Sequence, residues 1–178
     1  MNCSIRLVIA ALVVVLVAVL GACSPTLDWR EFTPEGSGLR VTFPCRVDRH
    51  ARPVQMAGAT VRMEMLVCGA GDATYAVSFF DVADPAQVSA AMAEWRATAI
   101  RNVQGAAPLQ QPWQIKGMTP NAESTRLSVA GQLPDGAAVR EHALFFARGL
   151  RVYSATVLGA NPPPQAVDTF FSGLKFPS

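Results

Sequence analysis

Alternation of apolar and polar residues predicts β-strands in two clusters of this chain. In the clearest case, Val61, Met63, Met65 and Val67 place their side chains on one face of a strand. Turn-forming residues at 69–72 and at 148–150 separate neighbouring strands. The expected strands are residues 39–43, 61–67, 74–82, 126–130, 139–147 and 151–158, with a further short strand at Ile115.

The apolar spacing changes to that of a helix in two places. The first helical stripe consists of Val88, Met92, Trp95, Ala99 and Val103. We expect Asp84 to cap this helix, Pro85 to occupy its first turn and Gly105 to end it. A second helix is expected after residues 161–162, with an apolar side formed by Val167, Phe170, Phe171 and Leu174. Helices that are apolar on one side must cover a sheet, so the predicted fold class is α+β, an antiparallel sheet with two helices packed on it.

The N-terminal residues have the pattern of a signal peptide. Met1–Arg6 carries one positive charge and precedes Leu7–Leu20, an uninterrupted apolar run of 14 residues. A membrane-spanning helix needs about 20 apolar residues, so a cleaved segment is favoured. The alternative is an uncleaved helix that continues through Gly21 and Ala22.

The run ends in Leu20-Gly21-Ala22-Cys23, which resembles the lipobox recognised by lipoprotein signal peptidases. The resemblance implies that Cys23 becomes the lipidated N-terminus of the mature chain and anchors it to a membrane. The expected domains are then a signal peptide at 1–22, a lipidated tether and lead-in segment at 23–34, and one globular domain at 35–178. Ser24, where an inner-membrane lipoprotein of the enterobacterial type has Asp, implies an envelope protein at the periplasmic face of the outer membrane.

Processing would leave two cysteines, Cys45 and Cys68, in the folded domain. Two thiols in an oxidising compartment predict a disulfide. A hairpin in which these cysteines face each other would have its turn centred between Met56 and Ala57. The alternative is a metal site that adds the two histidines of the chain, but the spacing lacks the close ligand pairs of structural zinc sites, so no metal ligands are predicted.

The charge balance gives no indication of a polyanion partner. The full chain has a formal charge of +2, and removing Arg6 with the signal peptide leaves +1. Arg46, Arg49, His50 and Arg52 form the nearest basic cluster, but Asp48 lies among them. We interpret this cluster as the solvated end of a hairpin and predict no nucleic-acid partner. Contact with lipid headgroups or peptidoglycan is the alternative.

Motifs for catalysis are missing from the sequence. The glycines at 69–72 lack the spacing of a phosphate loop, and Ser154 and Ser172 lie in no G-x-S-x-G motif. Glu141 and His142 are adjacent in a predicted strand, so their side chains point to opposite faces. The chain is therefore predicted to be non-enzymatic and to need no cofactor. A cleft joining His142 to Glu123 or Asp135 would restore an enzymatic hypothesis.

Aromatic residues give the one indication of a binding surface. Trp29, Phe32 and Trp113 lie outside the clearest strands and helices, where they either contact a partner or pin loops to the core. Three pairs of consecutive phenylalanines either fill two packed layers or line a cavity for an apolar ligand. These pairs are Phe79-Phe80, Phe145-Phe146 and Phe170-Phe171.

The order of segments resembles small envelope proteins with a PsbP-like domain. The resemblance rests on Trp29-x-x-Phe32, residues 39–44, the long middle helix, residues 149–153 and the closing residues 170–174. It implies an α/β/α sandwich and an accessory or assembly role without catalytic residues. The expected function is therefore a membrane-anchored lipoprotein that binds or stabilises a protein complex. The alternative is a carrier or sensor of a hydrophobic small molecule in the periplasm.

Overall fold

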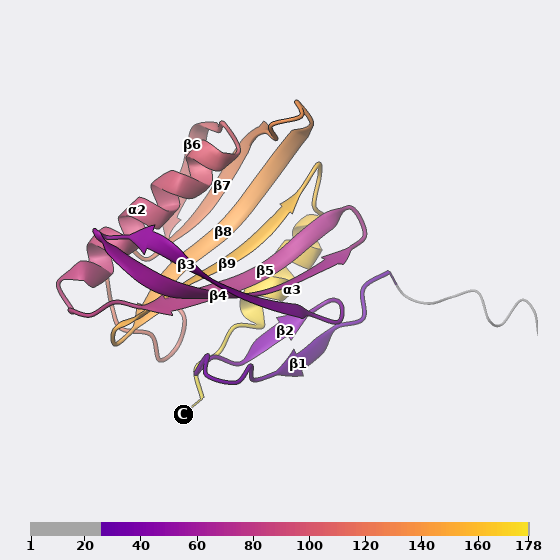
Figure 1. The fold of residues 1–178 in the computed structure, drawn as a ribbon. Coiled ribbons are helices and arrows are strands. Elements are labelled where there is room, and N and C mark those ends of the chain that lie inside the picture. The colour runs from indigo at the N-terminus through magenta and orange to yellow at the C-terminus, as the bar shows by residue number, and fades with distance from the viewer. Residues whose placement is uncertain (1–25, 178) are drawn as a thin grey trace, which may run out of the picture.

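The computed structural model describes residues 26–177 as an antiparallel sheet with two helices (Figure 1). The main sheet has seven strands in the order β3-β4-β5-β9-β8-β7-β6, and β1 and β2 form a separate pair. The elements are β1 Arg30–Phe32, β2 Val41–Phe43, β3 Asp48–Met56, β4 Ala59–Ala70, β5 Ala73–Asp81, α2 Gln87–Asn102, β6 Ala106–Pro112, β7 Thr125–Gln132, β8 Ala138–Arg148, β9 Arg151–Gly159 and α3 Pro164–Ser172. The predicted α+β class is confirmed at this level.

Consecutive residues of the central strands send their side chains to opposite faces of the sheet. Phe145 packs among residues that contact α2, whereas Phe146 belongs to the core under α3. Phe79 and Phe80 divide in the same way between the α3 side and the α2 side. The two helices therefore cover opposite faces, and both faces are filled by side chains.

The core on the α3 side includes the β1–β2 pair as well as the helix. Trp29 and Phe32 pack against this core, and the backbone N–H of Asp28 donates to the carbonyl of Pro44 at 2.8 Å. The folded domain thus begins earlier than residue 35, the boundary expected from the sequence. The difference arises because β1 is only three residues long, too short for an alternating pattern to show.

The β3–β4 hairpin differs from the expected geometry in its register. Its two turn residues, Ala57 and Gly58, both have positive φ, as a two-residue hairpin turn requires. This places the turn one residue later than predicted, with Asp48 opposite Val67. Cys45 precedes β3 and is not a cross-strand partner of Cys68.

Two further expectations from the sequence were wrong. Ile115 is buried in a loop, and the strand in this region is β6, which the prolines at 108 and 112 concealed. Helix α2 begins three residues after Asp84, and its N-cap position, Ala86, has no side-chain cap. The Asp84 carboxylate instead accepts from the Ala86 N–H at 2.8 Å, in a turn before the helix.

Within residues 26–177, no helix has both the length and the apolar character needed to span a membrane.

Candidate ligand-binding cleft

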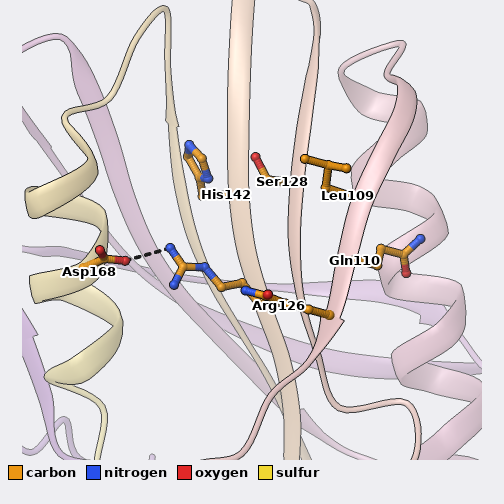
Figure 2. A pocket seen from close by; sticks show the side chains of 7 residues that line it. Leu109, Gln110, Arg126, Ser128, His142 and Asp168 are labelled. Atoms are coloured by element: carbon orange, nitrogen blue, oxygen red, sulfur yellow. Dashed lines mark hydrogen bonds and ion pairs between the residues drawn. The ribbon is translucent and has the colours of Figure 1, made fainter.

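A cleft of about 570 Å³ lies on the α3 side of the sheet, between that helix and the edge strand β6 (Figure 2). Helix α3 is nine residues long, whereas α2 on the other face has 16. The shorter helix leaves part of β6, β7 and β8 uncovered. The cleft is lined by Leu109, Gln110, Gln111, Arg126, Ser128, His142 and Asp168.

Strand register places most of the lining side chains in rows across the cleft floor. Leu109 is opposite Ser128, which is opposite His142 on the next strand. In the neighbouring row Gln111 is opposite Arg126. Directly opposed residues share a face of the sheet, so these side chains converge although they come from three strands.

Arg126 is fixed in position by contacts on several sides. Its guanidinium lies 5.4 Å from the ring centre of Trp113 and 5.2 Å from that of Phe171. Its Nη2 donates to Asp168 Oδ1 on α3 at 2.7 Å, and the arginine side chain is 22% exposed. The two rings flank the guanidinium and restrict its movement, which reduces the entropy that a ligand would have to remove.

His142 is half-buried in the same cleft, and its environment disfavours the charged imidazolium. Burial lowers its pKa most, and the positive charges of Arg126 and Arg140 lower it further. The carboxylate of Asp168 acts in the opposite direction. Two arginines therefore face one carboxylate around a neutral histidine, and the cleft has a local excess of positive charge at neutral pH.

Ser128, His142 and Asp168 are the residue types of a catalytic triad, but they do not have the hydrogen bonds of one. In a triad the base bonds both to the nucleophile and to the carboxylate. Among the hydrogen bonds of residues 26–177, none joins His142 to Ser128 or to Asp168, and the carboxylate bonds to Arg126 instead.

The acidic residues named in the enzymatic hypothesis lie elsewhere. Glu123 pairs with Arg96 on α2 at 2.8 Å, and Asp135 belongs to the turn between β7 and β8. Glu141 has a raised pKa but faces the α2 side, opposite to its neighbour His142. The structure therefore does not bring the proposed acid–base groups into one cleft.

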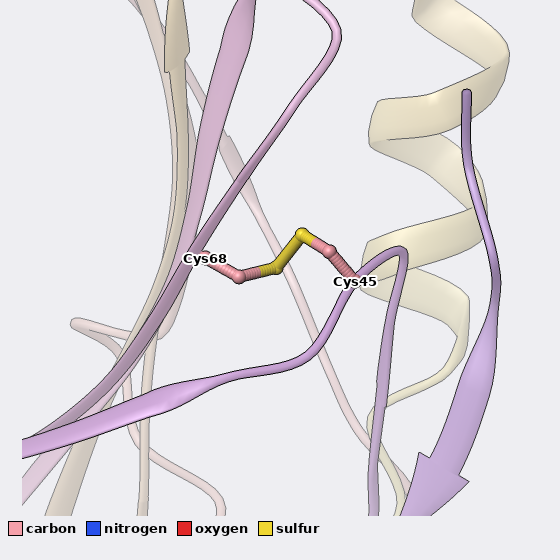
Figure 3. The surroundings of a disulfide bond; sticks show 2 residues. All are labelled: Cys45 and Cys68. Carbon is pink, nitrogen blue, oxygen red and sulfur yellow. A yellow bond between two sulfur atoms is a disulfide. The ribbon is translucent and has the colours of Figure 1, made fainter.

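The predicted disulfide between Cys45 and Cys68 is present (Figure 3). Cys68 lies in β4 and Cys45 in the loop after β2, with their Cα atoms 6.0 Å apart. The bond therefore ties the β1–β2 layer to the main sheet. The structure does not bring the four residues of the alternative metal site together, because the two sulfurs are bonded to each other and the two histidines lie on β3 and β8, at distant positions in the strand order.

The three aromatic residues proposed as a binding surface do not form one. Trp29 contacts Tyr75 at 6.1 Å between ring centres, and Phe32 contacts Phe43 at 6.0 Å. Both are half-buried and pin the N-terminal segment to the core. Trp113 alone is near the cleft, where it stacks on Arg126 and its buried Nε1 has no partner within the described part of the chain. Cys23, the predicted lipidation site, lies outside the described residues.

Of the residues that line the cleft, the sequence singled out only His142. Leu109 and Gln111 belong to β6, whose prolines hide the pattern of a strand, and Asp168 lies on the polar side of α3, which the sequence marks only by its apolar residues. One signal was available, since Arg126 and Ser128 alternate with Leu127 and Val129 along β7. This alternation showed that β7 has one polar face, but the sequence could not indicate what lies opposite.

Comparisons with known proteins do not identify the chain. No protein-family model and no curated protein matches it. A crystal structure of a protein of unknown function from Pseudomonas aeruginosa is similar, with 14% identity and a TM-score of 0.37, covering 81% of this chain and 89% of the other.

Proposed function

We propose that this protein is a lipid-anchored component of the bacterial envelope whose folded domain binds a partner protein at the membrane surface. In this proposal Cys23 carries the lipid at the periplasmic face of the outer membrane, and the domain acts without catalysing a reaction. The cleft beside β6 is the docking site.

Two features of the chain support the anchor and the compartment. The residues that precede Cys23 have the order of a lipoprotein signal, with a charged start, an apolar run and small residues. The disulfide between Cys45 and Cys68 is the kind of bond that forms and persists outside the reducing cytosol.

The exposure of Leu109 is the observation that carries the binding function. This side chain is 73% exposed, the largest fraction among the large apolar residues of the described chain. It lies at the rim of a cleft that also offers an arginine, a histidine and a serine. An apolar contact beside convergent polar groups is typical of a recognition site.

The PsbP-like architecture remains part of the proposal. A sheet covered by one helix on each face is compatible with it, and such domains serve as accessory or assembly factors. The alternative function, a carrier of hydrophobic molecules, was suggested by the phenylalanine pairs. These rings pack into the two cores, so this motivation for a carrier is removed.

Site-specific photocrosslinking in intact cells tests the docking site. A photoreactive residue replaces Leu109, and a second chain carries it in place of Ala90, which is exposed on α2 on the opposite face. We expect a reproducible protein adduct from position 109 and none from position 90. Adducts of equal yield from both positions, or none from either, would contradict docking in the cleft.

The anchor requires a separate measurement. Cys23→Ser should abolish fatty-acid labelling and leave the precursor unprocessed. Normal labelling of this variant would refute the lipoprotein assignment, without affecting the result at position 109.

A further inference from the structure

We infer that the cleft recognises a carboxylate of an acidic segment of the partner protein, bound by Arg126 with an apolar neighbour of that carboxylate against Leu109. This inference rests on the proposed function and specifies the chemistry of the partner.

The cleft contains hydrogen-bond donors suited to a carboxylate. A guanidinium has five N–H donors in a planar fork that matches a carboxylate. Within residues 26–177, Arg126 uses its side chain for one hydrogen bond, to Asp168. The Ser128 hydroxyl and the His142 imidazole lie in the same cleft and make no hydrogen bond to another described side chain (Figure 2).

The charges around the cleft favour an anion. Arg126 in the cleft and Arg140, an exposed residue of β8 beside the cleft, contribute two positive charges against the one negative charge of Asp168. The third strand of the cleft, β6, supplies no charged side chain. Asp168 is itself 63% exposed, so its ion pair with Arg126 contributes little to stability, and an incoming carboxylate can compete for the guanidinium.

The edge strand indicates how the partner binds. β6 contains Pro108 and Pro112, which lack the N–H groups that an added strand would need. Recognition through side chains is therefore favoured over extension of the sheet. Leu109 and Arg126 lie in neighbouring rows on the same face, so an apolar residue next to an acidic one can reach both.

A matched pair of peptides tests the inference on the full chain purified in detergent. One fluorescein-labelled peptide has a leucine followed by a glutamate, and the other has glutamine in place of that glutamate, both with amidated ends. Fluorescence anisotropy gives the two Kd values. We expect the glutamate peptide to bind about tenfold more tightly, because charge-assisted hydrogen bonds to arginine are roughly twice as strong as neutral ones.

Substitution of the competing carboxylate gives an effect that loss of structure cannot produce. Asp168→Asn frees Arg126 and should tighten binding of the glutamate peptide several-fold. Arg126→Gln should abolish the preference for glutamate. The controls are Asp81→Asn and Arg151→Gln. These two residues form an ion pair like that of Asp168 and Arg126, and Arg151 also lies over a phenylalanine ring, 5.4 Å from its centre. Neither control should change binding.

The outcomes separate this inference from the proposed function. Equal binding of the two peptides, no binding of either, or weaker binding to Asp168→Asn overturns carboxylate recognition, even when position 109 crosslinks to a partner. If the glutamate peptide is preferred but no partner is crosslinked, the cleft binds carboxylates and the proposed protein partner is wrong. Competition by free glutarate at the concentration of the peptide would then identify a small acid as the ligand.

Discussion

The two faces of the sheet are covered in different ways. On the α2 side, a single helix of 16 residues packs on two apolar clusters along the sheet. On the α3 side, a helix of nine residues and the β1–β2 pair together cover the core, and the disulfide links the segment after β2 to β4. The face with the shorter helix is also the face with the cleft.

This difference shows how a short helix creates a site. The nine-residue α3 does not cover Arg126, Ser128 and His142, which line the cleft on its side of the sheet. Adjacent residues of one strand can therefore meet opposite environments. Glu141 is 7% exposed on the α2 side, whereas His142 lies half-buried in the cleft.

The largest expected effect concerns the covalent link on the α3 side. Cys45→Ala and Cys68→Ala should each lower the free energy of unfolding by roughly 3 to 4 kcal/mol, as expected for a bond that closes a loop of this length. The sequence separation is 23 residues. The double variant should lose little more than either single variant, because both remove the same bond. Urea unfolding under oxidising conditions measures all three losses.

Additive losses in the double variant would show that the cysteines act independently. A loss near zero in all three variants would mean that apolar packing alone holds the β1–β2 pair to the sheet. The α3 side would then be held in the same way as the α2 side.

The fold was predictable where periodicity was strong. The alternation along β4 and β8 and the long stripe of α2 gave both the element type and the α+β class, since these patterns reflect burial on one side. β1 and β6 were missed because a strand of three residues has no period, and because prolines in an edge strand remove the usual signal.

The disulfide and the cleft show two further limits of the sequence. Cysteine counting identified the correct pair, but the cross-strand geometry was wrong because Cys45 reaches β4 from a loop. The cleft depends on which strands become neighbours and on where α3 ends. Arg126 and Asp168 are 42 residues apart, and no local pattern relates them.

Glu141 provides the next test, because its burial on the α2 side makes the free energy of unfolding depend on pH. Burial raises its pKa from an ordinary value of 4.5 to about 7. Between these values the unfolded chain has released the proton while the folded chain retains it, so the free energy of unfolding falls as the pH rises. The stability that protonated Glu141 contributes is therefore complete below pH 4.5 and is lost as the pH rises through about 7.

Glu141→Gln removes the buried charge with little change in shape. We expect the variant to be more stable than the wild type by roughly 3 kcal/mol at pH 8 and nearly equal to it at pH 4, because one unit of pKa corresponds to about 1.4 kcal/mol. Urea unfolding at the two pH values gives the comparison. A difference that is the same at both pH values would contradict the assigned burial.

The smallest expected effect is the pH dependence of stability that His142 causes, and its sign is opposite to that of Glu141. Its pKa is lowered, so the folded chain resists protonation that the unfolded chain accepts near pH 6.5. Stability is therefore complete above that pH and is lost as the pH falls below it. His142→Gln should reduce the fall in the free energy of unfolding at acidic pH. Added salt should reduce the same fall in the wild type, because it screens the charges of Arg126 and Arg140. An NMR titration of the imidazole measures the pKa directly. A value above the ordinary one would mean that Asp168, and not the two arginines, dominates the field in the cleft, and the cleft would then favour a cation.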